Sequence, residues 1–231
     1  GKNIPNLIGK DFNSINNIEK QKLETARERL FAYRDNRIKP HRDEKILTSW
    51  NGLMVGSLAY GGKVLDNMDY INRAKKAADF IIANSLDKEG HLLSIYIDGK
   101  SYNLGFLEDY AFLVYGLLTL YGVTKDQVYL NISKRLKEDM KKLFWDDKDG
   151  GYFYYSNISE KLILRPKDYY DGAIPSGNSI ALFSLANLYV ITKDEDLYKR
   201  FQELLYSFGD NLNNNPSSYL YSILALIKLR I

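Results

Sequence analysis

Acidic residues stand at the predicted starts of two apolar helices. Glu108 and Asp109 begin the stretch LEDYAFLVYGLLTLY, and Asp171 begins DGAIPSGNS just before another apolar segment. Two carboxyl groups facing one pocket are the arrangement that cleaves glycosidic bonds by acid–base catalysis. Neighbouring residues on a helix point about 100° apart, so we expect Glu108 or Asp109 to pair with Asp171 or Asp43 rather than with each other. Glu108, Asp109 and Asp171 are the candidate catalytic residues.

A structural role competes with the chemical one at these positions. Acids in the first turn of a helix are stabilised by the helix dipole without any catalytic purpose, and Ser176, which follows Pro175, is placed to cap a helix. Ser176 has Ile174 and Asn178 where a nucleophile elbow needs glycines, and no Gly-Lys-Ser/Thr ending marks a phosphate loop. The alternative to capping is that Asp171, Ser176 and Asn178 face a ligand.

A second polar stretch, PHRDEKILTSWNG, leads into another apolar segment. A solvated run of charges is one interpretation, and a ligand-binding edge is the other. The candidate substrate-binding residues are His41, Asp43, Trp50, Asn51, Tyr110, Ser176 and Asn178.

The sequence predicts neither a metal site nor a cofactor. His41 and His91 are the only histidines and lie fifty positions apart, so they lack local metal-binding spacing. The run DDKDGG resembles the start of a calcium loop, but Gly151 and Ile158 occupy its fifth and twelfth positions counted from Asp147, and the twelfth should be an acid. We therefore predict a turn at DDKDGG.

Two kinds of helical segment alternate along the chain. Segments that are apolar nearly all round predict buried inner helices, whereas amphipathic segments with apolar residues every three or four positions predict outer helices. The predicted inner helices are 49–65, 107–121, 177–191 and 217–229, and the predicted outer helices are 69–85, 126–144 and 195–209.

Short links join each inner helix to the following outer helix and end in Asp69, Asp126 and Asp194, which are placed to cap the outer helices. The segments LLTLYGVTKD and LANLYVITKD nearly superimpose and indicate an internal repeat. The long links 86–106 and 145–176 contain strand-like pieces and each predict a small β-hairpin; in the second link these pieces are GYFYY and KLILR.

These elements predict an all-α fold, a partial α/α toroid of about three and a half antiparallel helix pairs plus an isolated helix near 18–34. We expect residues 1–231 to form one domain that is a fragment of the ring. The starts of the inner helices would gather at one end as a polar cup that suits a hydroxyl-rich ligand. The 19 tyrosines could stack on sugar rings, or only fill the helical core.

Composition narrows the function classes. The net charge is +3 and the Lys and Arg residues are scattered among acids, so nucleic acid is not an expected partner. The absence of cysteine excludes thiol chemistry and favours a cytoplasmic setting. No run of eighteen apolar residues predicts a membrane span, and the first twenty residues lack the apolar core of a signal peptide.

Four stretches carry a resemblance to a known family. HRDEKILTSWNGLMVGSLA, LEDYAFLVYGLLTLY, LFWDDKDGGYF and DGAIPSGNSIA together resemble the family of thioredoxin-domain-containing proteins that includes bacterial YyaL and a vertebrate spermatogenesis-associated protein. The resemblance covers about residues 40–185. It implies a six-hairpin toroid related to glycosidases and N-acylglucosamine epimerases, preceded by a thioredoxin-like domain that this chain does not include. We therefore expect the chain to be a piece of a longer protein.

Three functional hypotheses stay open at this point, including whether the chain is an enzyme. The first is binding or processing of a sugar or polyol, with glycoside hydrolysis by paired carboxylates as the reaction. The second is a sugar epimerase or isomerase, which would need His41 or His91 as a base. The third is a scaffold that works with a thioredoxin-like domain, and the flanks of a partial ring would favour self-association.

Overall fold

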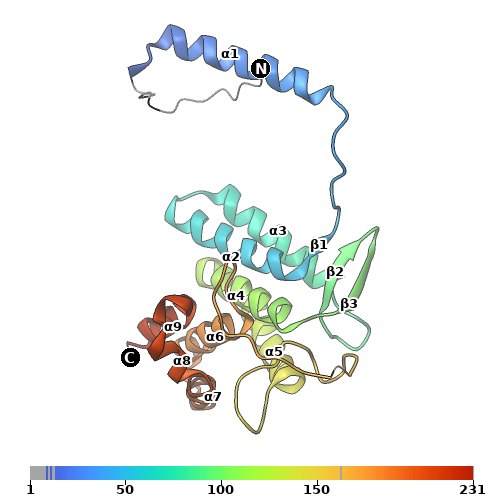
Figure 1. Cartoon of the computed structure of the whole chain (residues 1–231), viewed down its shortest axis with the longest axis vertical. Helices are drawn as coiled ribbons and strands as arrows, with labels where there is room; N and C mark the ends of the chain where they lie inside the picture. The colour runs from blue at the N-terminus through green and yellow to red at the C-terminus, as the bar shows by residue number, and fades with distance from the viewer. Residues whose placement is uncertain (1–8, 10, 12–13, 162, 231) are drawn as a thin grey trace. The chain divides into compact units, whose positions relative to one another are not determined.

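The computed structural model describes residue 9, residue 11, residues 14–161 and residues 163–230. They divide into two compact units, one up to Asp43 and one from Glu44 onward. The first unit contains α1 (Asn17–Asp35), shown in blue in Figure 1. Asn16 and Glu19 close a capping box at its start, and no residue of α1 is buried. The helix predicted near 18–34 is confirmed, whereas a single domain over 1–231 stays a prediction.

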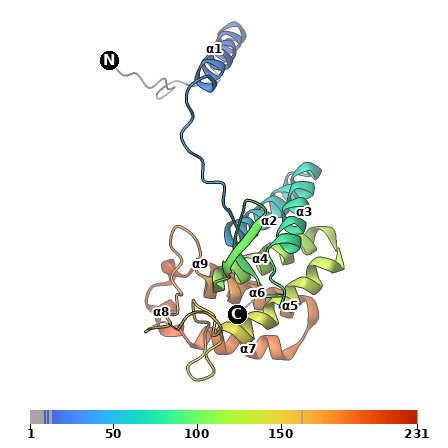
Figure 2. The ribbon, with the colours of Figure 1, turned by 90° about the vertical axis from the view of Figure 1, so that its right-hand side faces the viewer.

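The second unit consists of helix pairs joined in sequence. Each outer helix packs on the inner helix that precedes it, and the inner helices pack against one another in chain order, as Figures 1 and 2 show for the pair of α2 and α3. The inner helices are α2 (Thr48–Val64), α4 (Leu107–Thr124), α6 (Gly177–Thr192) and α9 (Leu220–Leu229). The outer helices are α3 (Met68–Asn84), α5 (Gln127–Phe144) and α7 (Glu195–Tyr206), and the short α8 (Gly209–Asn214) and 3-10 helix η2 (Pro216–Ser218) lead into α9.

Burial follows the two sequence patterns. Helices α4 and α6 are buried on most sides, with Phe112 and Leu182 fully enclosed, whereas α5 buries one stripe that includes Leu136 and Met140. Each fully buried large apolar side chain contributes roughly 1.5–3 kcal/mol to folding. The alternation of inner and outer helices predicted from the sequence is confirmed. No helix among the described residues has the length and apolarity to cross a membrane.

Two of the three predicted helix caps are confirmed. Asp126 accepts a hydrogen bond from Val128 N at the start of α5, and Asp194 accepts one from Asp196 N at the start of α7. The prediction for Asp69 is wrong, because α3 begins two residues earlier than that capping role requires. Asn67 caps α3 instead, and Asp69 lies in the first turn, where the helix dipole still favours an acid.

The first predicted hairpin is confirmed. Strand β2 (Leu93–Ile97) pairs antiparallel with β3 (Lys100–Leu104), and β1 (Ile46–Leu47) adds to the other edge of β2. The two-residue turn between β2 and β3 is Asp98–Gly99, and both residues have positive φ. An Asp-Gly pair is favoured there because a type I′ turn needs positive φ at both central positions.

The second predicted hairpin, between GYFYY and KLILR, is wrong: the described residues of the two stretches form no paired strands. Tyr154 N donates to Pro166 O at 2.8 Å, but Pro166 has no N–H with which to return a bond. The Tyr155 carbonyl oxygen accepts a hydrogen bond from the Arg165 side chain, at 2.6 Å, and not from the backbone of a facing strand. Leu162, inside the predicted second strand, lies outside the described residues.

The stretch DDKDGG forms a turn, as predicted. Asp146 Oδ1 accepts a hydrogen bond from Lys148 N at 2.9 Å, and Gly150 and Gly151 both have positive φ. Asp146 Oδ2 lies 2.6 Å from Lys167 Nζ, and only 13% of the Asp146 side chain and 16% of the Lys167 side chain are exposed. This ion pair fastens the turn to the later part of the link.

The Asp146–Lys167 pair predicts an acid-sensitive contribution to stability. The hydrogen bond from Lys167 lowers the pKa of Asp146, so the stabilisation is present above the ordinary pKa of an aspartate, about 4, and is lost as the pH falls through the lowered value. Lys167→Met should flatten the decline in the free energy of unfolding below about pH 4, as measured by urea denaturation at several pH values. Identical pH profiles for the two proteins would contradict this assignment.

Candidate functional site

The starts of the four inner helices lie together at one end of the second unit, which we call the N-terminal rim. Asp109 of α4 bonds the start of α2, and Asp171 bonds the start of α9. Helices α4 and α6 meet at Gly177, where a Cβ would lie 2.9 Å from the Leu107 side chain. The structure therefore brings together the helix starts that the sequence predicted to form one cup.

Asp109 holds two parts of the rim together. Its Oδ1 accepts from Ser49 N and its Oδ2 from Phe106 N, both at 2.9 Å, and only 1% of the residue is exposed. Burial raises the pKa of Asp109, although the hydrogen bonds from Phe106, Ser94 and Ser49 oppose the rise. Because both carboxylate oxygens bind backbone N–H groups, Asp109 has a positioning role at the starts of α2 and α4.

Asp171 links the starts of the other two inner helices, α6 and α9. Its Oδ1 accepts from Ser176 N at 2.9 Å and its Oδ2 from Tyr221 N at 2.8 Å. One carboxylate thus bonds the residue that caps α6 and a residue in the first turn of α9. Asp171 is only half-buried, but both of its oxygens are already engaged by the backbone.

Ser176 and Asn178 are buried under the rim. Ser176 caps α6 by accepting a hydrogen bond from Ser179 N at 3.1 Å, as the capping alternative predicted. Asn178 Oδ1 accepts from Tyr152 N, and its Nδ2 donates to the carbonyl oxygens of Tyr152 and Asp168. The Asn178 amide is fully buried and holds the 145–176 link against α6, so the structure does not place it facing a ligand.

Glu108 differs from these residues. It is half-buried at the start of α4, and among the described residues no hydrogen bond or ion pair is formed by its carboxyl group. Burial raises the pKa of Glu108 to about 7, and the charges of Asp109 and Asp168 add to the rise. A carboxyl group that titrates near neutral pH can both give and take a proton in a reaction, as a general acid or base must.

Asp168 is the neighbouring carboxylate that the sequence analysis missed. It is exposed, and its Oδ1 accepts from Tyr170 N at 3.0 Å. Nothing in KDYYDG distinguishes Asp168 from an ordinary loop acid. It lies near Glu108 only because Asn178 binds the Asp168 carbonyl oxygen and fixes the link on α6.

Aromatic side chains lie near the starts of the inner helices. The rings of Phe106 and Tyr154 stack with centroids 5.3 Å apart. Burial first, and then the charge of Glu108, raises the pKa of Tyr154 to about 12, which identifies Tyr154 as a neighbour of Glu108. Trp50 at the start of α2 is 61% exposed and Tyr170 is 59% exposed. These exposed rings offer faces to a ligand at the rim.

The remaining predicted site residues have other surroundings. Asn51 Nδ2 donates to Leu47 O at 2.8 Å within α2, and the buried Tyr110 hydroxyl accepts from Leu92 N at 2.8 Å. His41 and Asp43 belong to the first unit, so their predicted binding roles stay predictions.

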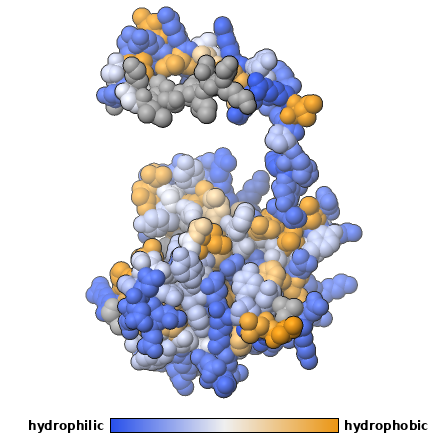
Figure 3. All heavy atoms as spheres, in the orientation of Figure 1, coloured by the Kyte–Doolittle hydropathy of each residue, from blue (hydrophilic) through white to orange (hydrophobic). Residues whose placement is uncertain are grey.

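A groove of about 590 Å³ lies between the inner helices nearer their C-terminal ends. Its lining includes Tyr60 of α2, Tyr115 of α4, Phe183 of α6 and Leu224 of α9. Tyr60 and Leu224 are among the exposed apolar side chains; on the face drawn in Figure 3, hydrophobic residues are interspersed with hydrophilic ones. The groove is an alternative to the N-terminal rim as a ligand site. Self-association of the chain stays a prediction.

Sequence comparison gives homologues but no matching family model. Spermatogenesis-associated protein 20 of Homo sapiens is 38% identical over 204 residues, which are 84% of this chain and 26% of that protein. Its Rattus norvegicus counterpart is 37% identical over the same shares of the two chains. The chain thus spans about a quarter of the length of these relatives.

Structural comparison identifies the fold. A GH76 α-mannanase of Bacteroides thetaiotaomicron superimposes with a TM-score of 0.67 at 18% identity, over 92% of this chain and 64% of that one. Cellobiose 2-epimerase of Bacillus thermoamylovorans gives 0.60 at 22% identity, over 74% and 46%, and a D-mannose isomerase gives 0.63 at 22%, over 74% and 44%. The predicted all-α fold, a partial α/α toroid, is confirmed.

Proposed function

Because the chain is homologous to part of spermatogenesis-associated protein 20 and has the fold of sugar-processing enzymes, we propose that its N-terminal rim binds and processes a sugar or polyol. Glu108 carries this proposal. It is a half-buried carboxyl group without a hydrogen-bond partner among the described residues, and its pKa is raised to about 7. Leaving a carboxyl group unpaired and partly desolvated costs stability, which favours a functional reason for its presence.

Glycoside hydrolysis with Glu108 as general acid is the reaction that we propose. The second carboxylate would be Asp168, which is exposed, and whose charge helps to raise the pKa of Glu108. Asp109 and Asp171 were also predicted to be catalytic, but their oxygens bind backbone N–H groups. We assign them the positioning of the helix starts around Glu108.

Trp50 and Tyr170 supply the proposed sugar-binding faces. Both residues are more than half exposed. The apolar face of a pyranose stacks on such rings while its hydroxyls bind polar neighbours. We expect the ligand to be neutral, because an anionic sugar would be repelled by Asp168 and Asp171 and would oppose ionisation of Glu108.

Epimerisation or isomerisation is the alternative reaction, supported by the cellobiose 2-epimerase and D-mannose isomerase structures that share the fold. It needs a base that removes a proton from carbon, and a carboxyl group with a pKa of about 7 can act as one. Hydrolysis releases a new reducing end, whereas epimerisation or isomerisation interconverts two sugars, so product analysis of one incubation distinguishes the reactions.

The test uses Glu108→Gln and Asp168→Asn with a panel of mannosides and cellobiose as probes. Loss of one acid–base group typically costs about 10²–10⁴-fold in rate, and we expect Glu108→Gln to cost at least about 10²-fold while sugar binding persists. The control is Asp98→Asn, an exposed acid in the β2–β3 turn. If no probe binds or reacts, or if Glu108→Gln leaves turnover unchanged, the catalytic proposal is wrong and a scaffold role is favoured.

The raised pKa of Glu108 also predicts a pH dependence of stability. A carboxyl group whose pKa is raised in the folded protein stabilises it fully below the unfolded pKa, and that stabilisation is lost as the pH rises through about 7. The free energy of unfolding of the wild type should therefore decline between about pH 5 and pH 8 relative to that of Glu108→Gln. Denaturant unfolding across this range measures the difference; parallel curves would show that Glu108 titrates normally.

A further inference from the structure

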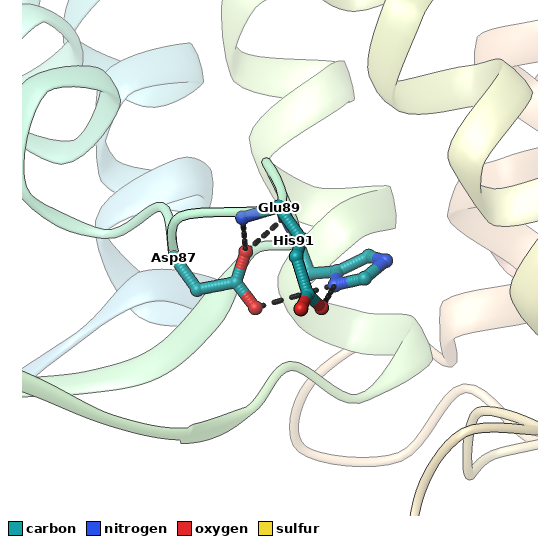
Figure 4. Close-up of side chains that lie close together, drawn as sticks. All are labelled: Asp87, Glu89 and His91. Atoms are coloured by element: carbon teal, nitrogen blue, oxygen red, sulfur yellow. Dashed lines mark hydrogen bonds and ion pairs between the residues drawn. The ribbon is translucent and has the colours of Figure 1, made fainter.

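A histidine and two acids converge in the turn that follows α3. Asp87, Glu89 and His91 occupy alternate positions, and their side chains point toward one another in Figure 4. His91 Nδ1 lies 3.2 Å from Asp87 Oδ2 and 3.5 Å from Glu89 Oε2. The spacing of the two histidines in the sequence gave no indication of this cluster, because its other members are acids.

The spacing of these atoms suits a shared metal ion. Nitrogen and oxygen ligands about 2.0–2.2 Å from a zinc ion lie roughly 2.8–3.6 Å from their neighbours in octahedral or tetrahedral geometry. The two distances from His91 Nδ1 fall in that interval, and all three ligand atoms lie within 4.8 Å of one another. An ion could therefore bind all three atoms with small side-chain adjustments.

The turn is held in place without the ligand atoms. Asp87 uses its other oxygen, Oδ1, to accept from Glu89 N at 2.9 Å and from His91 N at 2.8 Å, and Asp87 N donates to His91 O. Gly90 supplies the positive φ that closes the turn. Asp87 Oδ2 and His91 Nδ1 contact each other at 3.2 Å, so an ion would take the place of this one contact at a position that the backbone fixes.

Charge also favours a cation. Among the described residues, the Asp87 and Glu89 carboxylates lie within 4.0 Å of a His91 ring nitrogen and form no ion pair with Lys or Arg. With a neutral imidazole the cluster carries two negative charges within a few ångströms, which a divalent ion would neutralise.

We propose that Asp87, Glu89 and His91 form a binding site for a divalent transition metal of the Zn²⁺ class, through Asp87 Oδ2, Glu89 Oε2 and His91 Nδ1. One imidazole nitrogen with two carboxylates matches borderline ions better than Mg²⁺, which prefers an all-oxygen shell. Three protein ligands leave coordination positions for water. The proposal is independent of the reaction at Glu108.

Zn²⁺ titration of the intact chain tests this site, because the chain contains only two histidines. In ¹H–¹⁵N spectra of the imidazoles, we expect Zn²⁺ to shift the His91 resonances in the pattern of Nδ1 coordination and to leave His41 nearly unchanged. Mg²⁺ at the same concentration should leave both unchanged. Equal responses of His41 and His91, or no response of His91, would overturn the proposal.

Variants test the two acids by calorimetric Zn²⁺ titration. Glu89→Gln removes a ligand whose side chain is 79% exposed, so its fold should be preserved. Asp87→Asn keeps an oxygen that can accept the two backbone hydrogen bonds but removes the second carboxylate oxygen. Loss of a residue that only hydrogen-bonds to a metal ligand already lowers metal affinity about 10–100-fold. Loss of a ligand itself should therefore weaken Zn²⁺ binding at least about tenfold in each variant. His41→Ala and Asp98→Asn are the controls; an affinity for Glu89→Gln equal to theirs would contradict the site.

Discussion

Replacing Asp109 with Ala is expected to lower the free energy of unfolding by about 3 kcal/mol or more. The carboxylate bonds Ser49 N and Phe106 N, so its removal leaves two N–H groups unpaired at the starts of α2 and α4. Each unpaired buried donor costs roughly 1–3 kcal/mol, and the truncation also leaves a cavity. Urea denaturation monitored by circular dichroism measures the loss.

Glu108→Ala is the matched control for Asp109, because it removes an acid from the adjacent position of the same helix. Glu108 has no hydrogen-bond partner among the described residues and a pKa raised to about 7, so its removal should change stability little or raise it at pH 8. Asp109→Ala should thus disturb folding, and Glu108→Ala only function. If Glu108→Ala destabilises the chain as much as Asp109→Ala, Glu108 has a structural role and the proposed site loses its main support.

The second large effect is expected where α2 and α4 cross. A Cβ on Gly116 would lie 2.3 Å from the carbonyl oxygen of Gly52, and backbone cannot move aside as a flexible side chain can. Gly116→Ala should therefore separate the two helices and lower the free energy of unfolding by about 3 kcal/mol. Thermal or urea unfolding measures this directly.

Gly122→Ala is the control for the same substitution in the same helix. A Cβ on Gly122 meets no atom within 4 Å, and alanine is favoured over glycine in a helix by roughly 0.5–1 kcal/mol. Gly122→Ala should therefore stabilise the chain while Gly116→Ala destabilises it. Equal effects of the two changes would mean that α2 and α4 do not approach as closely as described.

The helices could be predicted because the buried face of a helix requires apolar residues in every turn, and this pattern can be read from the sequence. Inner α4 and α6 are apolar all round, outer α5 is amphipathic, and predicted and observed starts agree within a residue or two for most helices. The last inner helix was placed too early because residues 217–219 adopt η2 and a cap before α9. At α3 the error came from two neighbouring residues that can both cap a helix, since Asn67 caps it and Asp69 lies in the first turn.

The site was harder to predict, because the sequence does not show which carboxylates accept hydrogen bonds from the backbone of other helices. Glu108, Asp109 and Asp171 all stand beside helix starts, yet Asp109 and Asp171 bond the backbone of a neighbouring inner helix, up to 60 positions away in the sequence, while Glu108 does not. Asp168 lies near Glu108 through contacts of the Asn178 side chain with a distant link. Only the tertiary structure distinguishes Asp109 and Asp171, which position helix starts, from Glu108, which has no hydrogen-bond partner among the described residues.

Sugar binding followed on the two tryptophan indole signals most directly tests the central claim, that the N-terminal rim is the ligand site. Trp50 lies exposed on the rim, whereas Trp145 lies under Arg200 with 4.2 Å between the guanidinium carbon and the ring centroid. Titration with D-mannose and cellobiose should shift the Trp50 indole signal and the resonances of Glu108 and Tyr170, and leave Trp145 unchanged. Shifts confined to Tyr60, Tyr115 and Phe183 in the groove at the other end of the inner helices would contradict the account.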